Sequence, residues 1–227
     1  MTATRMPRRA ALSLRATGVL FLVGVILHPH APNAHTMAQV AYTQTGQPDW
    51  WPAHLFLLSS YVLFAVFVFS MSRFDGLPPA APRVLSFARP IAVLCVVAML
   101  VHLLLPLGRA SVAHSHHGWA LWVKDVVESV DALWALTVAA VAWLLGRIGT
   151  ADHRISALLG VVGGIGFALF SALVPLTDVV VSMQLTRSLL HVVPVFGLLV
   201  VAWALVAGSV GFLQTRARIN PPVEGAP

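Results

Sequence analysis

Long apolar stretches alternate with short polar segments along nearly the whole chain. A helix needs about 20 mostly apolar residues to cross the hydrocarbon core of a bilayer. Six stretches are about that long or longer, and they cover residues 12–29, 53–72, 89–107, 119–147, 155–175 and 186–213. Open sheet edges are not tolerated in hydrocarbon, so helices are expected. The pattern predicts an all-α integral membrane protein, with one domain of six transmembrane helices over residues 1–213 and a disordered cytoplasmic tail over 214–227.

Composition agrees with a membrane protein whose main partner is the lipid bilayer. The chain is 58% hydrophobic and 10% charged, whereas soluble domains carry about 25% charged residues. The net charge of +6 does not indicate nucleic-acid binding, because the basic residues lie mainly in the short segments and tails outside the spans. The single cysteine, Cys95, excludes an intramolecular disulfide and a cysteine-rich metal site.

The distribution of arginine predicts the orientation in the membrane. With the N-terminus inside, the three basic residues on the outer side are Arg109, Lys124 and Arg187. The inner segments then hold Arg5, Arg8, Arg9, Arg15, Arg73, Arg83, Arg89, Arg147, Arg154, Arg216 and Arg218. Basic residues favour the cytoplasmic side. We therefore expect a multi-pass protein of the plasma (inner) membrane with both termini in the cytoplasm.

The first apolar stretch also has features of a secretory signal peptide. Arg8 and Arg9 precede it, and small residues lie near Ala34. Cleavage there leaves five spans. Pro32 and Asn33 match a small-x-small cleavage site poorly, so the uncleaved six-span form is preferred.

Histidine is distributed asymmetrically in this topology. Nine of the ten histidines fall on the outer side, and only His153 is on the inner side. Four of them lie at the outer ends of four different spans, at a similar depth: His28, His54, His102 and His191. The other five lie in the loops above: His30, His35, His114, His116 and His117. The four span-end histidines predict a polar pocket at the outer face.

The fourth span adds ionisable residues at the same depth. A helix turns by about 100° per residue, which places Lys124, Glu128 and Asp131 on one face with Asp125 at its edge. Ionisable groups within a membrane are costly, so a functional site is the default hypothesis for them. The ordinary explanation is that Lys124 and Glu128, four residues apart, neutralise each other.

These residue types suit a transition metal. Imidazole binds zinc, copper and iron, and carboxylate ligands extend the choice to iron and manganese. The predicted metal ligands are His28, His54, His102, His191 and Glu128. A single b-type haem, with His191 and either His54 or His102 as its two axial ligands, is the other cofactor considered. Glu128, Asp125 and Asp131 are the candidate catalytic acids or bases, although no sequence motif defines a reaction or settles whether the protein is an enzyme.

Two other classes of protein fit the same residues. In a proton-coupled transporter of a small molecule or an ion, the histidines and acids form a proton relay, since histidine titrates near neutral pH. In a non-catalytic membrane subunit, the outer face docks a partner within a homo- or hetero-oligomer. The absence of an inverted repeat weighs slightly against a secondary transporter.

Two further patterns concern packing. Trp50, Trp51, Trp119 and Trp122 are expected at the outer membrane interface, which indole rings favour. Gly160 and Gly164 form a small-xxx-small pattern that allows close helix approach. An alanine- and glycine-rich helix produces such a pattern equally well by chance.

Overall fold

The structure is a computed structural model. It describes the backbone of residues 6–31, 34–74, 77–109, 119–148, 151–180 and 183–219. It describes the side chains of residues 6–31, 34–36, 38–74, 77–109, 122–127, 129–148, 154–173 and 192–210. The secondary structure of these residues is helical throughout, with no strand among them.

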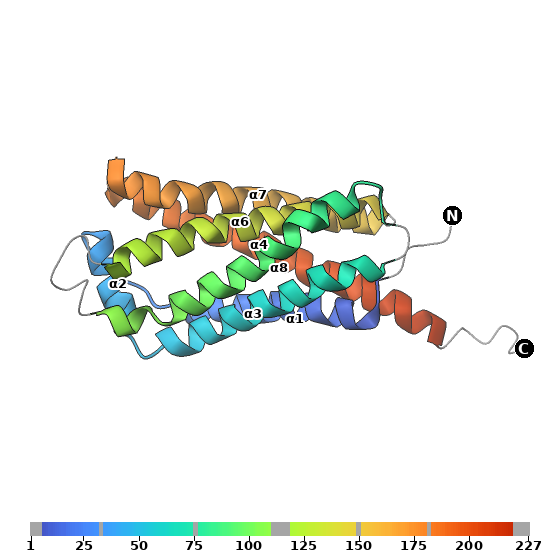
Figure 1. Cartoon of the computed structure of the whole chain (residues 1–227), viewed down its shortest axis with the longest axis horizontal. Helices are drawn as coiled ribbons and strands as arrows, with labels where there is room; N and C mark the ends of the chain where they lie inside the picture. The colour runs from blue at the N-terminus through green and yellow to red at the C-terminus, as the bar shows by residue number, and fades with distance from the viewer. Residues whose placement is uncertain are drawn as a thin grey trace, which may run out of the picture.

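Six long helices make up the fold (Figure 1), and each is long and apolar enough to cross a membrane. They are α1 (Arg8–Leu27), α3 (Trp50–Ser70), α4 (Ala81–Leu103), α6 (Trp119–Ile148), α7 (Ala151–Val180) and α8 (Met183–Ile219). Three short helices join them: α2 (Met37–Thr45), η1 (Met71–Arg73) and η2 (Leu105–Gly108). The prediction of an all-α protein with six membrane-length helices is confirmed.

Several helices differ in length from the sequence prediction, and α7, for example, covers Ala151–Val180 rather than residues 155–175. The helix α4 begins at Ala81 rather than at residue 89, because Pro82 lies in its first turn, where proline needs no hydrogen-bond partner. The helix α8 continues to Ile219, well past residue 213. Glutamine, alanine and arginine favour helix in this stretch, so helix replaces part of the predicted disordered tail. Residues 220–227 lie outside the described part of the chain.

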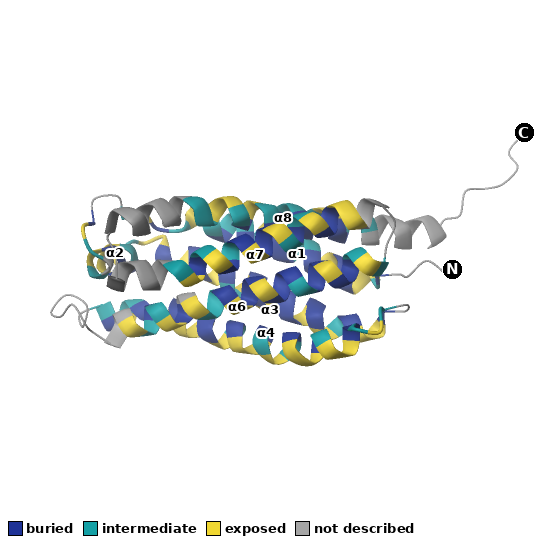
Figure 2. Cartoon of the chain, turned by 90° about the horizontal axis from the view of Figure 1, so that it is seen from above, coloured by how far each residue is buried: buried dark blue, intermediate teal, exposed yellow. Residues whose placement is uncertain are grey.

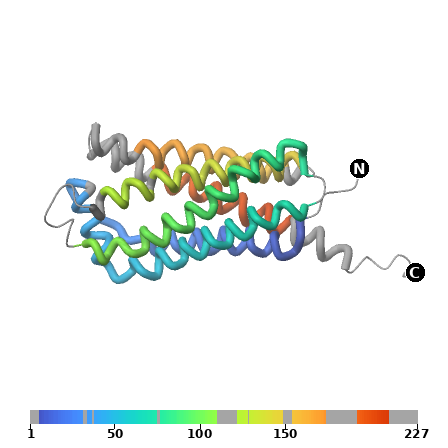
Figure 3. Tube along the Cα trace, in the orientation of Figure 1, coloured from blue at the N-terminus to red at the C-terminus, as the bar shows by residue number. Residues whose placement is uncertain are grey.

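The six long helices form a closed ring. Each helix packs against the next along the chain, and α8 returns to pack against α1. Figures 1 and 3 show that α1 begins and α8 ends at one end of the bundle, and α2 lies at the other. These ends are called the termini end and the α2 end below. Figure 2 shows buried residues on the inward faces of the helices and exposed ones on the outward faces.

The centre of the ring is filled by aromatic side chains around Trp134 of α6, which is 1% exposed. Its indole is stacked between Phe21 of α1 and Tyr61 of α3, with ring centroids 5.2 Å and 4.7 Å away. The edges of Phe64 and Phe167 complete the contact. The interior at this level is therefore packed solid.

Small and polar residues allow neighbouring helices to approach closely. Between α1 and α3, the Ser13 hydroxyl donates to the Leu63 carbonyl at 2.7 Å, and the Ser60 hydroxyl donates to the Thr17 carbonyl at 3.1 Å. Between α6 and α7, a Cβ atom built on Gly164 falls 2.5 Å from the Ala135 carbonyl oxygen. The close approach predicted for this glycine is confirmed, because an inter-helix contact requires the missing side chain.

Candidate functional site at the α2 end

Three histidines from three helices meet at the α2 end. His28 directly follows α1, His54 lies in the second turn of α3, and His102 lies in the last turn of α4. The ring centroids of His28 and His54 are 5.0 Å apart, and those of His54 and His102 are 4.9 Å apart. The helices alternate in direction, so residues far apart in sequence arrive at one level, as predicted from the span ends.

His28, His54 and His102 form the histidine cluster, and Trp50 packs against it. Its indole ring stacks on His54 at 3.8 Å and on His102 at 5.3 Å between centroids. The indole N–H donates to the Leu103 carbonyl at 3.2 Å and so satisfies a carbonyl at the end of α4. Trp50 is 2% exposed. Its side chain faces the interior of the bundle, because it is one helical turn from His54 and shares its inward face.

The other predicted interface tryptophans are placed differently. Trp51 and Trp122 are 40% and 68% exposed and lie on the outward surface. The side chain of Trp119 lies outside the described side chains. Adjacent residues on a helix point about 100° apart, and for this reason Trp50 and Trp51 have opposite environments.

Hydrogen bonds define which nitrogen carries the proton in two of the histidines. A carbonyl oxygen can only accept a hydrogen bond. The Nδ1–H of His54 therefore donates to the Trp50 carbonyl at 2.7 Å, and the Nδ1–H of His28 donates to the Pro29 carbonyl at 3.1 Å. In both neutral rings Nε2 is left with a free lone pair. The Nε2 atom of His54 and the Nδ1 atom of His102 are buried and have no hydrogen-bond partner.

His28 lies just outside the first membrane-length helix and is neutral near pH 7. Burial lowers its pKa from 6.5 to about 4. The hydrogen bond to Pro29 opposes this effect, and electrostatic repulsion between the protonated ring and the nearby His30 and Lys124 adds to it. A neutral imidazole is the form that can offer a lone pair to a metal ion.

The short helix α2 lies beside the cluster at this end of the bundle. The Thr36 side chain accepts a hydrogen bond from the Gln39 backbone and caps the start of α2. Ala41 of α2 packs on Trp50 and Leu105. The Gln44 amide donates to the Pro29 carbonyl at 3.0 Å, which ties α2 to the chain beside His28. The cluster therefore borders Trp50, and α2 packs beside it through Trp50 and Pro29.

The ionisable residues of α6 continue inward from the histidine level. Lys124 is 5% exposed, and Asp125 is half-buried. Two turns deeper, the carboxylate of Asp131 accepts a hydrogen bond from the Tyr61 hydroxyl at 2.9 Å. The predicted face of α6 thus points partly into the bundle. Glu128 and His191 lie within α6 and α8, but their side chains are outside the described ones.

The Tyr61–Asp131 hydrogen bond links α3 to α6 and makes a testable contribution to stability. We expect Tyr61→Phe to lower the free energy of unfolding by about 1 kcal/mol, since hydrogen bonds between transmembrane helices average about 0.6 kcal/mol and reach about 1.7. Thermal unfolding in detergent measures the change. Asp131→Asn should lower the free energy of unfolding less in the Tyr61→Phe variant than in the native chain, because the hydrogen bond is already absent there. Additive losses from the two substitutions contradict the coupling.

The described side chains do not form a preassembled metal site. Among them, no group of three histidine, cysteine or acidic residues has the geometry to hold an ion. The reason is the orientation of the rings. Imidazole lone pairs lie in the ring plane, and His54 and His102 are stacked with an interplanar angle of 20°. Ring rotation about the side-chain torsions is needed before these nitrogens converge on one ion.

Two residues of the site were not predicted from the sequence, Trp50 as a neighbour of the cluster and Tyr61 as the partner of Asp131. Both have a signal in the sequence. They lie four residues before and seven residues after His54, and these spacings place side chains on one helical face. The signal is weak because most residues on that face of α3 are also apolar or aromatic.

Comparison of this chain with protein-family models, with curated proteins and with solved structures gives no match. The fold itself defines the class: a helical protein with six membrane-length helices and a cluster of three histidines at one end.

Proposed function

We propose that this protein binds a transition metal ion through the histidine cluster. The observation that carries the proposal is the hydrogen bonding of His28 and His54, whose Nδ1–H groups donate to backbone carbonyls and leave Nε2 free. Histidines that bind metals usually have this arrangement, because the second hydrogen bond orients the ring and makes the free nitrogen more basic. His102, with a buried unpaired Nδ1, is the third proposed ligand.

The unpaired nitrogens favour a bound ligand. A buried polar atom without a partner costs about 1–3 kcal/mol, and His54 and His102 bring two such atoms to adjacent rings. A metal ion that accepts both lone pairs removes this cost. Borderline ions such as zinc, copper and iron prefer imidazole. Glu128 and His191 are the proposed additional ligands, and Asp125 is a proposed acid–base residue near them.

The packing of the described rings disfavours a haem held between His54 and His102, whereas the haem pairings with His191 lie outside the described side chains. A b-type haem needs an apolar slot between its two axial histidines. His54 and His102 instead stack on each other at 4.9 Å, and Trp50 stacks on both. Three rings occupy the space that a haem plane requires between these two residues.

The proposed location is the outer face of the plasma (inner) membrane. Arg8, Arg73, Arg83 and Arg147 lie at or near the helix ends of the termini end, and basic residues favour the cytoplasmic side. With both termini in the cytoplasm, the α2 end and its histidine cluster face the outside. The proposed ligand therefore arrives from the extracytoplasmic side.

A proton-transport function has less support from the described interior. The ionisable groups descend from Lys124 to Asp131, and the aromatic packing around Trp134 follows directly. Beyond it, the buried described side chains include Phe67, Val138 and Leu144. A relay across the whole membrane needs titratable groups at that depth.

Metal content of the purified protein tests the proposal. We expect the full chain in mild detergent to retain about one equivalent of zinc, copper or iron, measured by mass spectrometry of the metal. Replacing His28, His54 and His102 together by glutamine should weaken binding by more than about a hundredfold, since even loss of a supporting residue costs about 10–100-fold.

The loop histidines provide the control. Replacing His114, His116 and His117 by glutamine removes as many imidazoles and should leave affinity nearly unchanged. Absence of any metal after reconstitution with each ion contradicts the proposal. A Soret absorption band in the purified protein identifies haem instead, and proton-linked flux in liposomes that Glu128→Gln abolishes identifies the transporter.

A further inference from the structure

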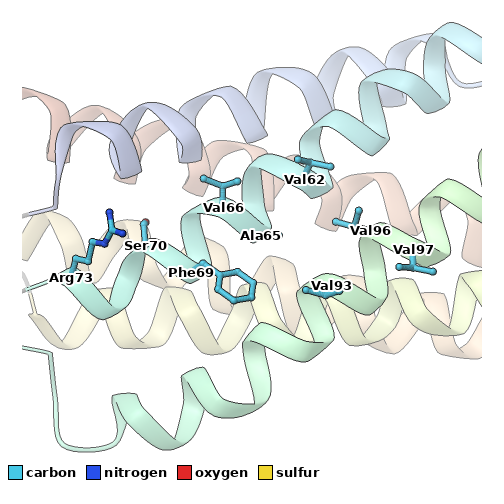
Figure 4. Close-up of a pocket in the computed structure, with 9 residues that line it drawn as sticks. All are labelled: Val62, Ala65, Val66, Phe69, Ser70, Arg73, Val93, Val96 and Val97. Atoms are coloured by element: carbon cyan, nitrogen blue, oxygen red, sulfur yellow. The ribbon is translucent and has the colours of Figure 1, made fainter.

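A groove lies on the outward surface between α3 and α4, away from the histidine cluster. Its volume is about 480 Å³, within the range of sites for small ligands. Its walls are apolar, with Val62 and Val66 from α3 and Val93 and Val97 from α4. Figure 4 shows Ser70 and Arg73 at one end and the valines along the rest of its length.

The length of the groove matches one leaflet of a bilayer. Val62 lies near the middle of the span, and Arg73 lies at its termini end, eleven residues further on. At about 1.5 Å per residue this distance is roughly 16 Å, and half of the hydrocarbon core is about 15 Å. Along α3 the groove therefore extends from the midplane to the membrane surface, and on α4 it includes Val93 near the midpoint of the span and Val97 one turn beyond it.

One arginine lines the surface end of the groove, and a second lies beside its wall residue Phe69. Arg73 lines it directly, and the guanidinium of Arg89 on α4 lies over the ring of Phe69, 5.7 Å from its centroid. The Nε atom of Arg89 is buried and has no hydrogen-bond partner. Guanidinium groups bind phosphate oxygens with paired hydrogen bonds.

We propose that this groove binds an anionic phospholipid of the leaflet at the termini end. One acyl chain lies along the valines of α3 and α4, and the phosphate contacts Arg73 and Arg89. Each part of the groove suits one part of the phospholipid. The apolar wall accommodates an acyl chain one leaflet long, and the arginines attract a negatively charged headgroup. The cytoplasmic leaflet carries the anionic lipids that such arginines attract.

Native mass spectrometry of the full chain tests this site. The protein is purified with equal amounts of phosphatidylglycerol and phosphatidylcholine, and the retained lipids are counted. We expect one phosphatidylglycerol molecule to be retained in preference to phosphatidylcholine. Arg73→Gln should lower this retention by about fivefold, because one arginine near the surface contributes about 1 kcal/mol to the binding of anionic lipid.

Arg147→Gln is the matched control for charge. Like Arg73, Arg147 is exposed and lies at the same end of the bundle, and its guanidinium lies 5.7 Å from the ring centroid of Trp143. It does not line the groove. Its replacement should leave lipid retention unchanged. Equal loss from Arg73→Gln and Arg147→Gln overturns the proposal, because it shows general attraction to a positive surface.

Val93→Phe tests the acyl-chain part without changing charge. Val93 is 47% exposed, so a larger side chain there fills the groove and does not disturb the core. We expect lower retention of phosphatidylglycerol. Leu158→Phe, at a 62% exposed position on α7, should have no effect. Unchanged retention of phosphatidylglycerol in Val93→Phe overturns the proposal. A protein dimer that dissociates in this variant also overturns it, because the groove is then occupied by a second copy of the chain.

Discussion

Replacing Trp134 by alanine should lower the free energy of unfolding by about 3 kcal/mol, the largest effect expected of a single core substitution. Aromatic-to-alanine changes in cores cost about 3–5 kcal/mol, through lost transfer energy and a residual cavity. Unfolded transmembrane helices remain in lipid or detergent, so the transfer part is small and the lower end applies. The cavity part is large because Trp134 joins α1, α3 and α7 through Phe21, Tyr61 and Phe167.

Trp143→Ala is the matched control for this prediction. Trp143 is the same residue type on the same helix, but it is 43% exposed on the outward surface. Its loss should cost about 0.5–1 kcal/mol at most, through the contact with Arg147. Thermal unfolding in detergent, followed by size-exclusion chromatography, compares the two variants. Equal destabilisation of both contradicts the central role of Trp134.

The second large effect is expected at the contact between α6 and α7. In Gly164→Ala, the new methyl group falls 2.5 Å from the Ala135 carbonyl oxygen and 2.9 Å from the Ala139 Cβ atom. Neither neighbour can rotate away, so the two helices must separate. Overpacking of this kind costs about 1–3 kcal/mol. The same unfolding measurement should show this loss.

Gly197→Ala introduces the same side chain where there is room for it. The nearest atoms, from Phe167 and Phe21, are 3.5 Å from the new methyl group, an ordinary contact distance. Because alanine favours helix over glycine by about 1 kcal/mol, this variant should be neutral or slightly more stable. If Gly164→Ala is as stable as Gly197→Ala, the close approach of α6 and α7 is not a stabilising contact.

The candidate site was only partly predictable from the sequence. The positions of His28, His54 and His102 at span ends predict that they share a depth, and the structure places their rings side by side. The predicted set of five metal ligands could not be assessed in this way, because metal binding depends on how the imidazole rings are oriented. These orientations depend on contacts across helices, such as the stacking of Trp50 on His54 and His102.

The six membrane-length helices and the end at which three of the histidines meet could both be predicted from the sequence. The length of each apolar stretch predicts a span, and the order of the spans along the chain sets the alternating directions of the helices. Which apolar residues face the core depends on how the helices pack against one another. Trp134 and Trp143 belong to one helix and differ from 1% to 43% in exposure. In lipid, both the buried and the exposed faces of a helix are apolar, so hydrophobic periodicity does not distinguish them.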